Sequence, residues 1–251
     1  MISCKSPREI ELMKEAGRII GLLFVEMKQY IVPGVSTQEL DEKAEAIITR
    51  EGGIAACKGY YGFPGAICVS VNETLVHGIP SKKIILREGD IVTLDVVVKK
   101  AGYHADAART YPVGIINERA KRLIETTKES WWYASQFIKP GNKIGDISHA
   151  IQEYNESRGY SLPREYTGHG IGRAMHEDPS IPNYGNAGTG VTLMEGMALA
   201  IEPMVAEGKP NIRVLGDGWT AKMKDGKLSA HYENTVVVTK DGFIALTLEQ
   251  E

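Results

Sequence analysis

Two parts of this 251-residue chain resemble each other, which points to a fold built from two like halves. Pro33-Gly34 precedes a capped helical pattern, and Pro140-Gly141 precedes another further along the chain. The segment EGDIVTLD (88–95) then matches EGMALAIE (195–202) at the same offset. Short matches also arise by chance, but the shared offset indicates an internal duplication. We expect a single domain over residues 1–251, divided into halves of roughly 1–115 and 116–251.

Helix-start signals open the first half. Ser6 and Ser36 are each followed three residues later by a glutamate, which is the pattern of a capping box. Pro7 suits the first position of a helix, and apolar residues recur at helical spacing from Ile10 to Met27. These patterns predict four helices, over residues 7–32, 37–51, 117–138 and 144–158.

Segments between the helices alternate in the way that half-buried strands do. Within 91–99, one face holds valines and a leucine, while Thr93 and Asp95 lie on the other face. The patterns predict strands over residues 66–75, 91–99, 103–113, 197–202 and 232–239. Helix pairs combined with such strands indicate an α+β fold, with a mostly antiparallel sheet covered on one side by helices.

Acidic residues occur inside strand-like segments where apolar residues are expected. Asp95 interrupts IVTLDVVV, and Glu202 interrupts MALAIEPM at the matching position of the repeat. A buried carboxylate is costly unless it is paired, so each could contact a buried arginine or lysine. Asp106 and Glu233 form a second matched pair, so four carboxylates would meet near a pseudo-twofold axis. Because four such charges repel one another, we expect a pair of divalent cations between them.

The segment TGHGIGRAMHEDP (167–179) supplies an imidazole for such a site. His169 lies between two glycines, which allow the backbone to pass close to another group. A lone histidine is more often a hydrogen-bonded core residue, but this setting favours a metal ligand. Oxygen ligands with one imidazole suit Mn, Fe, Co or Zn. His176 is expected to contact a substrate, and His77 is a third candidate.

Composition narrows the class of protein. The net charge is -3, which argues against the basic face that nucleic-acid binding needs. The longest apolar run, Ile19–Val25, is shorter than the roughly 20 residues of a membrane span. The N-terminus lacks the apolar core of a signal peptide. Three cysteines without a CxxC spacing, Cys4, Cys57 and Cys68, are typical of a reducing cytoplasm.

The motifs together resemble those of the type I methionine aminopeptidases, a group of the pita-bread metallopeptidases. The resemblance covers nearly the whole chain. The segments on which it rests are VNETLVHGIP (71–80), GDIVTLDVVV (89–98), GYHADAARTYPVG (102–114), TGHGIGRAMHEDP (167–179), IEPM (201–204), GDGWT (216–220) and LSAHYENTVVVT (228–239). It implies the pita-bread fold, with pseudo-twofold halves that form one catalytic metallopeptidase domain.

The resemblance also implies roles for the candidate residues. Asp95 would bind one divalent ion, Asp106 and Glu233 would bridge two, and His169 and Glu202 would complete the other. His77 and His176 would flank the scissile bond, and Glu202 would transfer the proton of the attacking water. A methionine pocket is implied at Cys57, Tyr60, Phe63, Cys68, His77, Met175, His176 and Trp219. A monovalent cation is implied near Asn72, Thr74 and Ser229.

The activity implied is metal-dependent removal of the initiator methionine from nascent proteins, by a hydroxide held between two ions. A small second residue would be preferred. The implied enzyme is a cytoplasmic monomer that acts on nascent N-termini, at the ribosome if it docks there, with no nucleic acid or membrane partner. Two alternatives remain. One is another pita-bread peptidase, such as an Xaa-Pro aminopeptidase or a dipeptidase, and the other is a non-catalytic binding relative.

Some positions depart from the pattern of that family. Met175 stands where an aromatic residue is common, and His231 and Asn234 stand where glutamine and histidine are common. Asp106 lies between two alanines rather than between glycine and threonine. None of these departures removes an expected metal ligand, so we expect them to affect the pocket wall and the surroundings of the ligands.

Overall fold

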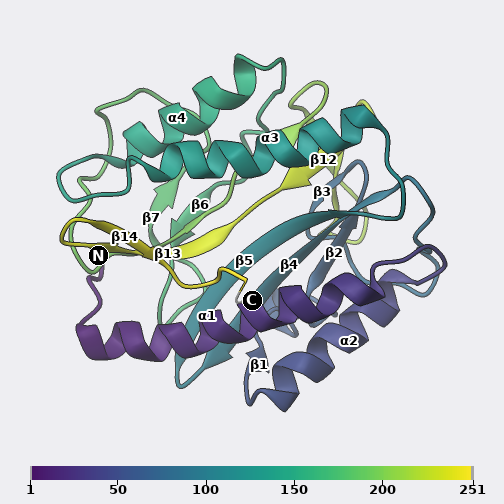
Figure 1. Cartoon of the computed structure of the whole chain (residues 1–251), viewed down its shortest axis with the longest axis horizontal. Coiled ribbons are helices and arrows are strands. Elements are labelled where there is room, and N and C mark those ends of the chain that lie inside the picture. The colour runs from purple at the N-terminus through teal and green to yellow at the C-terminus, as the bar shows by residue number, and fades with distance from the viewer. Residues whose placement is uncertain (1, 250–251) are drawn as a thin grey trace.

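The computed structural model describes residues 2–249. Two pairs of helices lie on either side of the long strands in the view of Figure 1. The α-helices are α1 (Pro7–Met27), α2 (Thr37–Arg50), α3 (Glu118–Ser135) and α4 (Ile144–Glu156), with short 3-10 helices η1 (Lys28–Tyr30) and η2 (Tyr60–Gly62). The first-half strands are β1 (Ile54–Ala55), β2 (Cys68–Val71), β3 (Thr74–Val76), β4 (Ile91–Lys100) and β5 (Tyr103–Pro112). The second-half strands are β6 (Gly168–Gly170), β7 (Glu177–Ile181), β8 (Ala198–Ile201), β9 (Met204–Ala206), β10 (Ile212–Val214), β11 (Ala221–Met223), β12 (Ser229–His231), β13 (Asn234–Thr239) and β14 (Gly242–Ala245).

The helix starts follow the capping pattern. The Ser6 and Ser36 side chains each accept a hydrogen bond from the backbone N–H of the glutamate three residues on. The carboxylate of that glutamate in turn accepts a hydrogen bond from the serine backbone N–H. Asn117 caps α3 through its side chain. The first helix ends earlier than predicted because the chain tightens into η1 at Lys28, before it reaches Pro33.

The strands pair antiparallel throughout the described registers, as the sequence predicted. In the first half, β4 lies between β1 and β2 and also forms a hairpin with β5. In the second half, the strand order is β14-β13-β8-β6-β7. α1 packs against β4 and β5, whereas α3 packs against α4 and β12. The predicted α+β architecture is therefore confirmed.

Each half has its own hydrophobic core. One cluster of buried side chains comes from residues between Ala16 and Val113. A second comes from residues between Ala120 and Val238, together with Ile91. A further cluster joins Met13 and Tyr103 of the first half to Ile171 and Val237 of the second. The single domain with a division near residue 115 stays a prediction, and residues 1, 250 and 251 lie outside the described part of the chain.

The two halves meet where β5 lies beside β13. The backbone N–H of Asp106 donates to Thr235 Oγ1 over 2.8 Å, and the Thr235 hydroxyl donates back to the Asp106 carbonyl. The backbone N–H of Glu233 donates to the carbonyl of Ala108 over 3.0 Å. One predicted acid from each half is thus fixed at this junction by main-chain bonds.

Three predicted strands have different bounds. The segment 66–75 divides into β2 and β3, because Asn72 adopts a left-handed conformation with φ of 54°. Glu202 follows the end of β8, and Glu233 lies between β12 and β13. These two acids therefore occupy strand ends rather than strand centres.

Candidate metal centre and substrate cavity

The predicted site residues from both halves line one cavity of about 180 Å³. Its lining contains every residue predicted for the divalent ions, catalysis or the methionine pocket: Cys57, Tyr60, Phe63, Cys68, His77, Asp95, Asp106, His169, Met175, His176, Glu202, Trp219 and Glu233. The sequence did not predict the other lining residues, which are Val76, Val97, Tyr166, Thr167 and Met204. The structure therefore brings the predicted metal ligands and the predicted methionine-pocket residues together in one cavity.

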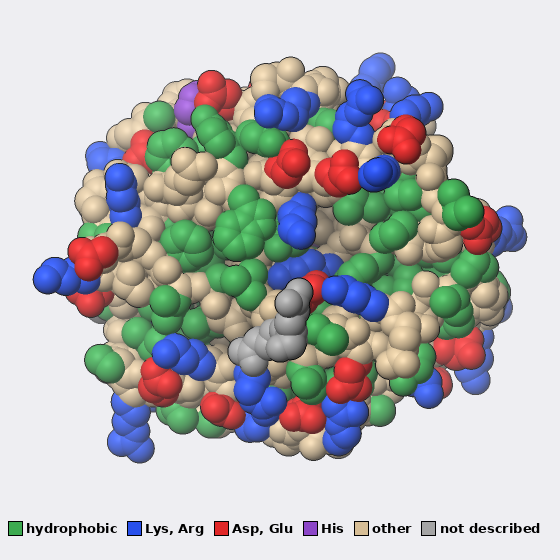
Figure 2. Space-filling model, viewed as in Figure 1, with side chains coloured by type: hydrophobic (Ala, Val, Ile, Leu, Met, Phe, Trp, Pro, Cys, Tyr) green, Lys and Arg blue, Asp and Glu red, His purple; other side chains and the backbone are tan. Residues whose placement is uncertain are grey.

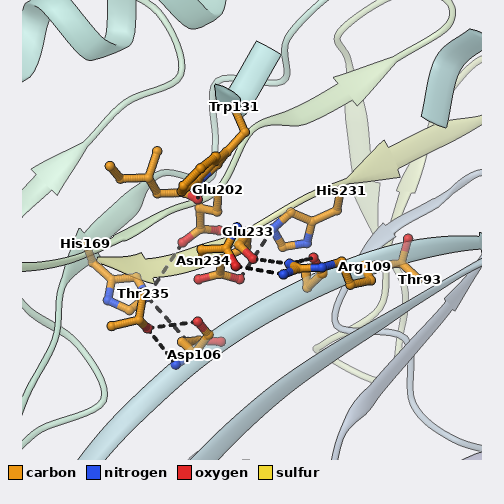
Figure 3. A network of polar contacts seen from close by, with 12 residues as sticks. Thr93, Asp106, Arg109, Trp131, His169, Glu202, His231, Glu233, Asn234 and Thr235 are labelled. Carbon is orange, nitrogen blue, oxygen red and sulfur yellow. Dashed lines mark hydrogen bonds and ion pairs between the residues drawn. The ribbon is translucent and has the colours of Figure 1, made fainter. Parts of the chain in front are cut away.

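His169 lies against two of the carboxylates. Its Nε2 atom is 3.7 Å from Asp106 Oδ2 and 3.6 Å from Glu202 Oε1. Its Nδ1 atom is 2.8 Å from the carbonyl oxygen of Gly170. Because a carbonyl can only accept, Nδ1 holds the proton and Nε2 presents its lone pair to the carboxylates (Figure 3).

The glycines beside His169 make this placement possible. A Cβ at Gly168 would collide with the carbonyl oxygen of Ala200 in β8, and one at Gly170 would collide with that of Asp178 in β7. β6 is thus squeezed between its two neighbours in the sheet. The sequence expectation of close backbone approach at these glycines is confirmed.

His231 is a second imidazole at the carboxylates, and the sequence analysis did not include it among the ligands. Its Nε2 atom is 3.6 Å from Glu233 Oε2 and 3.8 Å from Glu202 Oε2. Its side chain is 1% exposed. The available signal was a histidine two residues before Glu233.

The donor set fits a divalent cation. Within residues 2–249, no lysine or arginine forms an ion pair with Asp95, Asp106, Glu202 or Glu233. Asp106 Oδ1 and Glu233 Oε1 are buried and lack any hydrogen-bond partner. Two groups have ligand atoms close enough to share an ion: Asp106, His169 and Glu233, and Glu202, His231 and Glu233. Asp95 lines the same cavity but belongs to neither group.

The pKa values of the four carboxyl groups are those expected of a site that binds a cation. Burial raises the pKa of Asp95 from 3.8 to about 7. Burial, followed by repulsion from the neighbouring carboxylates, raises the pKa values of Asp106, Glu202 and Glu233 well above their usual range. A bound cation would relieve both effects.

The imidazoles are neutral at physiological pH and can act as ligands. Burial lowers the pKa of His169 to about 4, with a further contribution from His176. Burial likewise lowers the pKa of His231 to about 3, with smaller contributions from His77 and Arg109. Each of these side chains therefore keeps a lone pair available near neutral pH.

We expect metal affinity to rise with pH. In the metal-free protein, folding raises carboxyl pKa values, so the folded state holds protons that the unfolded state has released. The raised pKa of Asp95 makes a pH-dependent contribution to the stability of the folded, metal-free protein. This contribution is complete below about pH 3.8 and is lost as the pH rises through about 7. A cation must displace these protons.

Calorimetric titration with Mn²⁺ in buffers of different ionisation enthalpy should show more protons released at about pH 6 than at about pH 8. An affinity and proton count independent of pH would contradict this expectation.

Buried residues outside the cavity hold the acid-bearing strand ends in place. Arg109 donates to the carbonyl of Glu233 and, over 2.7 Å, to Asn234 Oδ1. Trp131 Nε1 donates to the carbonyl of Ile201 over 2.9 Å, directly before Glu202. These roles could not be predicted from the sequence, because Arg109 on β5 and Trp131 on α3 reach the strand ends only in the folded chain.

Two further histidines, His77 and His176, lie on the cavity wall. The Tyr60 hydroxyl is 2.8 Å from His176 Nδ1, and the His176 ring lies 4.3 Å from that of His169. His77 has a left-handed backbone with φ of 58°, and its ring packs edge-on against Tyr166. Such a conformation is uncommon outside glycine and often marks a functional position.

The other wall of the cavity is apolar and contains sulfur. Cys57, Phe63, Cys68 and Met175 pack with Val97 in one cluster. The Trp219 ring lies edge-on to Phe63, with centroids 5.2 Å apart. This wall lies beside the carboxylates rather than in the main core, so it borders a space that an unbranched apolar side chain could enter.

The chain belongs to metallopeptidase family M24, whose model matches residues 11–240. This confirms the predicted pita-bread metallopeptidase family. Methionine aminopeptidase 1 of Bacillus subtilis (strain 168) is 51% identical over 247 residues, which cover 98% of this chain and 99% of that protein. The methionine aminopeptidase of Escherichia coli (strain K12) is 44% identical, over 100% of this chain and 95% of that protein.

Solved structures agree with this assignment. The crystal structure of a methionine aminopeptidase from Thermotoga maritima is similar with a TM-score of 0.98 and 48% identity, over 99% of this chain and 100% of that one. A prolidase from Pyrococcus furiosus shares the fold alone, with a TM-score of 0.80 and 24% identity over 99% of this chain and 66% of that one.

Proposed function

We propose that this protein is a metal-dependent methionine aminopeptidase, which removes the N-terminal methionine from polypeptides. The observation that supports this most directly is the single cavity in which a sulfur-rich apolar wall faces buried carboxylates and imidazoles. One wall suits a thioether side chain, and the other suits ions that hydrolyse a peptide bond. The similarity to methionine aminopeptidases over the full chain length points to the same reaction.

Five residues are proposed to hold two divalent ions of Mn, Fe, Co or Zn: Asp95, Asp106, His169, Glu202 and Glu233. When bound, such ions polarise a peptide carbonyl and lower the pKa of water, so that hydroxide is available near neutral pH. The protein supplies buried ligands, of which Asp106 and Glu233 are held by the junction of β5 and β13. The monovalent cation near Asn72, Thr74 and Ser229 stays a prediction.

The side chains around the ligands have separate tasks in this proposal. Glu202 accepts the proton of the attacking water and returns it to the leaving amine. The Tyr60 hydroxyl lies 2.8 Å from His176 Nδ1, and its role in this proposal is to donate there, so that His176 Nε2–H would donate to the developing oxyanion. His77, on its strained turn, is placed to contact the scissile amide. The free α-amine of the substrate would bind beside the carboxylates, which makes the enzyme an exopeptidase.

Replacing Tyr60 by phenylalanine should lower kcat about tenfold and leave metal content unchanged. The substitution removes the hydroxyl that fixes the His176 tautomer, and loss of such orienting bonds typically costs about 10-fold to 100-fold. The matched control is Tyr61→Phe, because Tyr61 is adjacent and 86% exposed. Steady-state kinetics on a Met-Ala-Ser peptide should separate the two variants. Equal kcat values for both would show that the Tyr60 hydroxyl has no such role.

A direct assay tests the proposed reaction. Release of free methionine from Met-Ala-Ser should require added Mn²⁺ or Co²⁺, stop with a chelator, and resume when metal is restored. A small second residue should be preferred, so Met-Leu peptides should react more slowly than Met-Ala peptides. The competing activity within the fold, cleavage of Xaa-Pro peptides, is tested in the same assay. Faster hydrolysis of Ala-Pro than of Met-Ala-Ser would overturn the proposal.

The setting of the reaction is part of the proposal. Nascent polypeptides in the cytoplasm would be the natural substrates of a monomeric enzyme, with docking at the ribosome as one way to meet them. Within residues 2–249, none of the helices combines the length and the apolar character needed to cross a membrane. Figure 2 shows basic and acidic side chains intermingled over the face that carries α1 and α3. The expectation of no nucleic-acid binding stays a prediction.

A further inference from the structure

We propose that His231 ligates a divalent cation through its Nε2 atom, together with Glu202 and Glu233. This inference deepens the proposed function and rests on it, because it concerns the same metal centre. It adds a second imidazole, that of His231, to the five residues named above.

The first observation is that His231 has no other partner. Its side chain is 1% exposed, and neither Nδ1 nor Nε2 forms a hydrogen bond within the described part of the chain. A buried ring with two polar nitrogens is costly unless they are satisfied. The ring lies beside Glu202 and Glu233 in Figure 3, so its Nε2 faces oxygen atoms rather than the apolar core.

The second observation is the spacing of the donor atoms. His231 Nε2 lies 3.6 Å from Glu233 Oε2 and 3.8 Å from Glu202 Oε2, too far for a hydrogen bond. Two ligand atoms that bind the same ion, each at about 2.1 Å, lie about 3.4 Å apart when the angle at the ion is tetrahedral and about 3.6 Å apart when it is 120°. The gaps are therefore the size that a shared cation would fill after a small adjustment.

His169 provides an internal comparison. Its Nε2 atom lies 3.7 Å from Asp106 and 3.6 Å from Glu202, nearly the same separations as those of His231. The two imidazoles face different oxygens of one carboxylate, because His169 is nearest Glu202 Oε1 and His231 is nearest Glu202 Oε2. Glu202 is thus positioned to contribute one oxygen to an ion beside each histidine.

Local structure holds His231 in this position. His231 ends β12, and its backbone N–H donates to the hydroxyl of Thr110 over 2.9 Å. The hydroxyl of Thr110 also lies 2.9 Å from the His231 carbonyl. A backbone anchored on β5 leaves the imidazole little freedom to move away from the carboxylates, which lowers the entropy lost on metal binding.

The test uses the complete protein labelled with ¹⁵N-histidine and saturated with Zn²⁺, which is diamagnetic. Long-range NMR correlations from ring C–H to ring nitrogen report each of the six histidines separately. We expect the ¹⁵N chemical shift of Nε2 in both His169 and His231 to change, from its value in the metal-free protein to the value of a metal-bound nitrogen. His149 is exposed and outside the cavity, so its signals should stay unchanged.

A variant pair completes the test. His231→Gln keeps an amide donor but removes the imidazole, and His149→Gln is the matched control. Competition with a chelator should show that His231→Gln binds one Zn²⁺ at least about tenfold more weakly, while the His169 signal still shifts. The NMR measurement on the unsubstituted protein stands even if the variant does not fold.

The outcomes separate the two proposals. If Zn²⁺ shifts His169 Nε2 but not His231 Nε2, or if His231→Gln binds Zn²⁺ with unchanged stoichiometry and affinity, His231 is not a ligand and the proposed peptidase function is unaffected. If the protein binds no Zn²⁺ at all, the metal-dependent function fails together with this inference.

Discussion

Replacing Asp106 by alanine is expected to lower kcat/KM for a Met-Ala-Ser peptide by about three orders of magnitude or more. Asp106 lies 3.7 Å from the imidazole of His169 and is also bonded at the junction of the two halves. Removal of its carboxylate eliminates one donor of the group formed with His169 and Glu233, so binding of at least one cation should weaken strongly. Calorimetric titration with Mn²⁺ and release of free methionine measure the two effects.

The matched control for this prediction is Asp241→Ala. Asp241 is exposed between β13 and β14, so its loss changes the net charge equally without affecting the cavity. The Asp106 variant should remain folded, because alanine keeps the backbone bonds to Thr235 and removes a carboxylate that burial disfavours. Metal binding and turnover equal to those of Asp241→Ala would eliminate the proposed metal centre.

Replacing Arg109 by methionine is expected to lower the free energy of unfolding of the metal-free protein by about 3 kcal/mol. The guanidinium lies in contact with the ring of Tyr232 and donates to the Glu233 carbonyl and to Asn234. Methionine fills much of the same volume but takes the Arg109 donor away from the buried Glu233 carbonyl, and leaves Asn234 Oδ1 with the Thr247 hydroxyl alone. Urea unfolding followed by circular dichroism measures the change. Metal affinity should fall as well, because the backbone at Glu233 loses its anchor.

The control here is Arg119→Met. The Arg119 side chain is 74% exposed and pairs with Glu207 at the surface, where an ion pair contributes at most about 1 kcal/mol. Similar losses for both variants would mean that the buried bonds of Arg109 contribute no more than a surface pair. A large loss of stability in Arg109→Met without any change in metal affinity would restrict its role to folding.

The sequence predicted the long elements well because their signals are local. A capping box depends on residues three positions apart, and an alternating strand such as β4 shows its faces directly. The short strands β6, which carries His169, and β7 were not predicted, because their pairing partners are distant in sequence and the segments are too short to show a period.

The candidate site divides in the same way. Asp95, Asp106 and Glu202 could be selected because each interrupts a strand-like pattern with an acid, which needs no knowledge of the partner. Arg109 and Trp131 could not be assigned, since their hydrogen bonds cross to the opposite half of the chain. His231 had a visible signal beside Glu233, but only its distances to two carboxylates make it a candidate ligand.

The sequence by itself determined the types of element, the acids and imidazole that suit a divalent cation, and the family whose motifs contain them. These follow from local periodicity and from residue chemistry, both of which are written along the chain. Only the tertiary structure decided which oxygen faces which nitrogen, because β5 and β13 come together through bonds between residues more than a hundred positions apart. The separations of 3.6 to 3.8 Å around Glu202 arise from that packing, and no local pattern contains them.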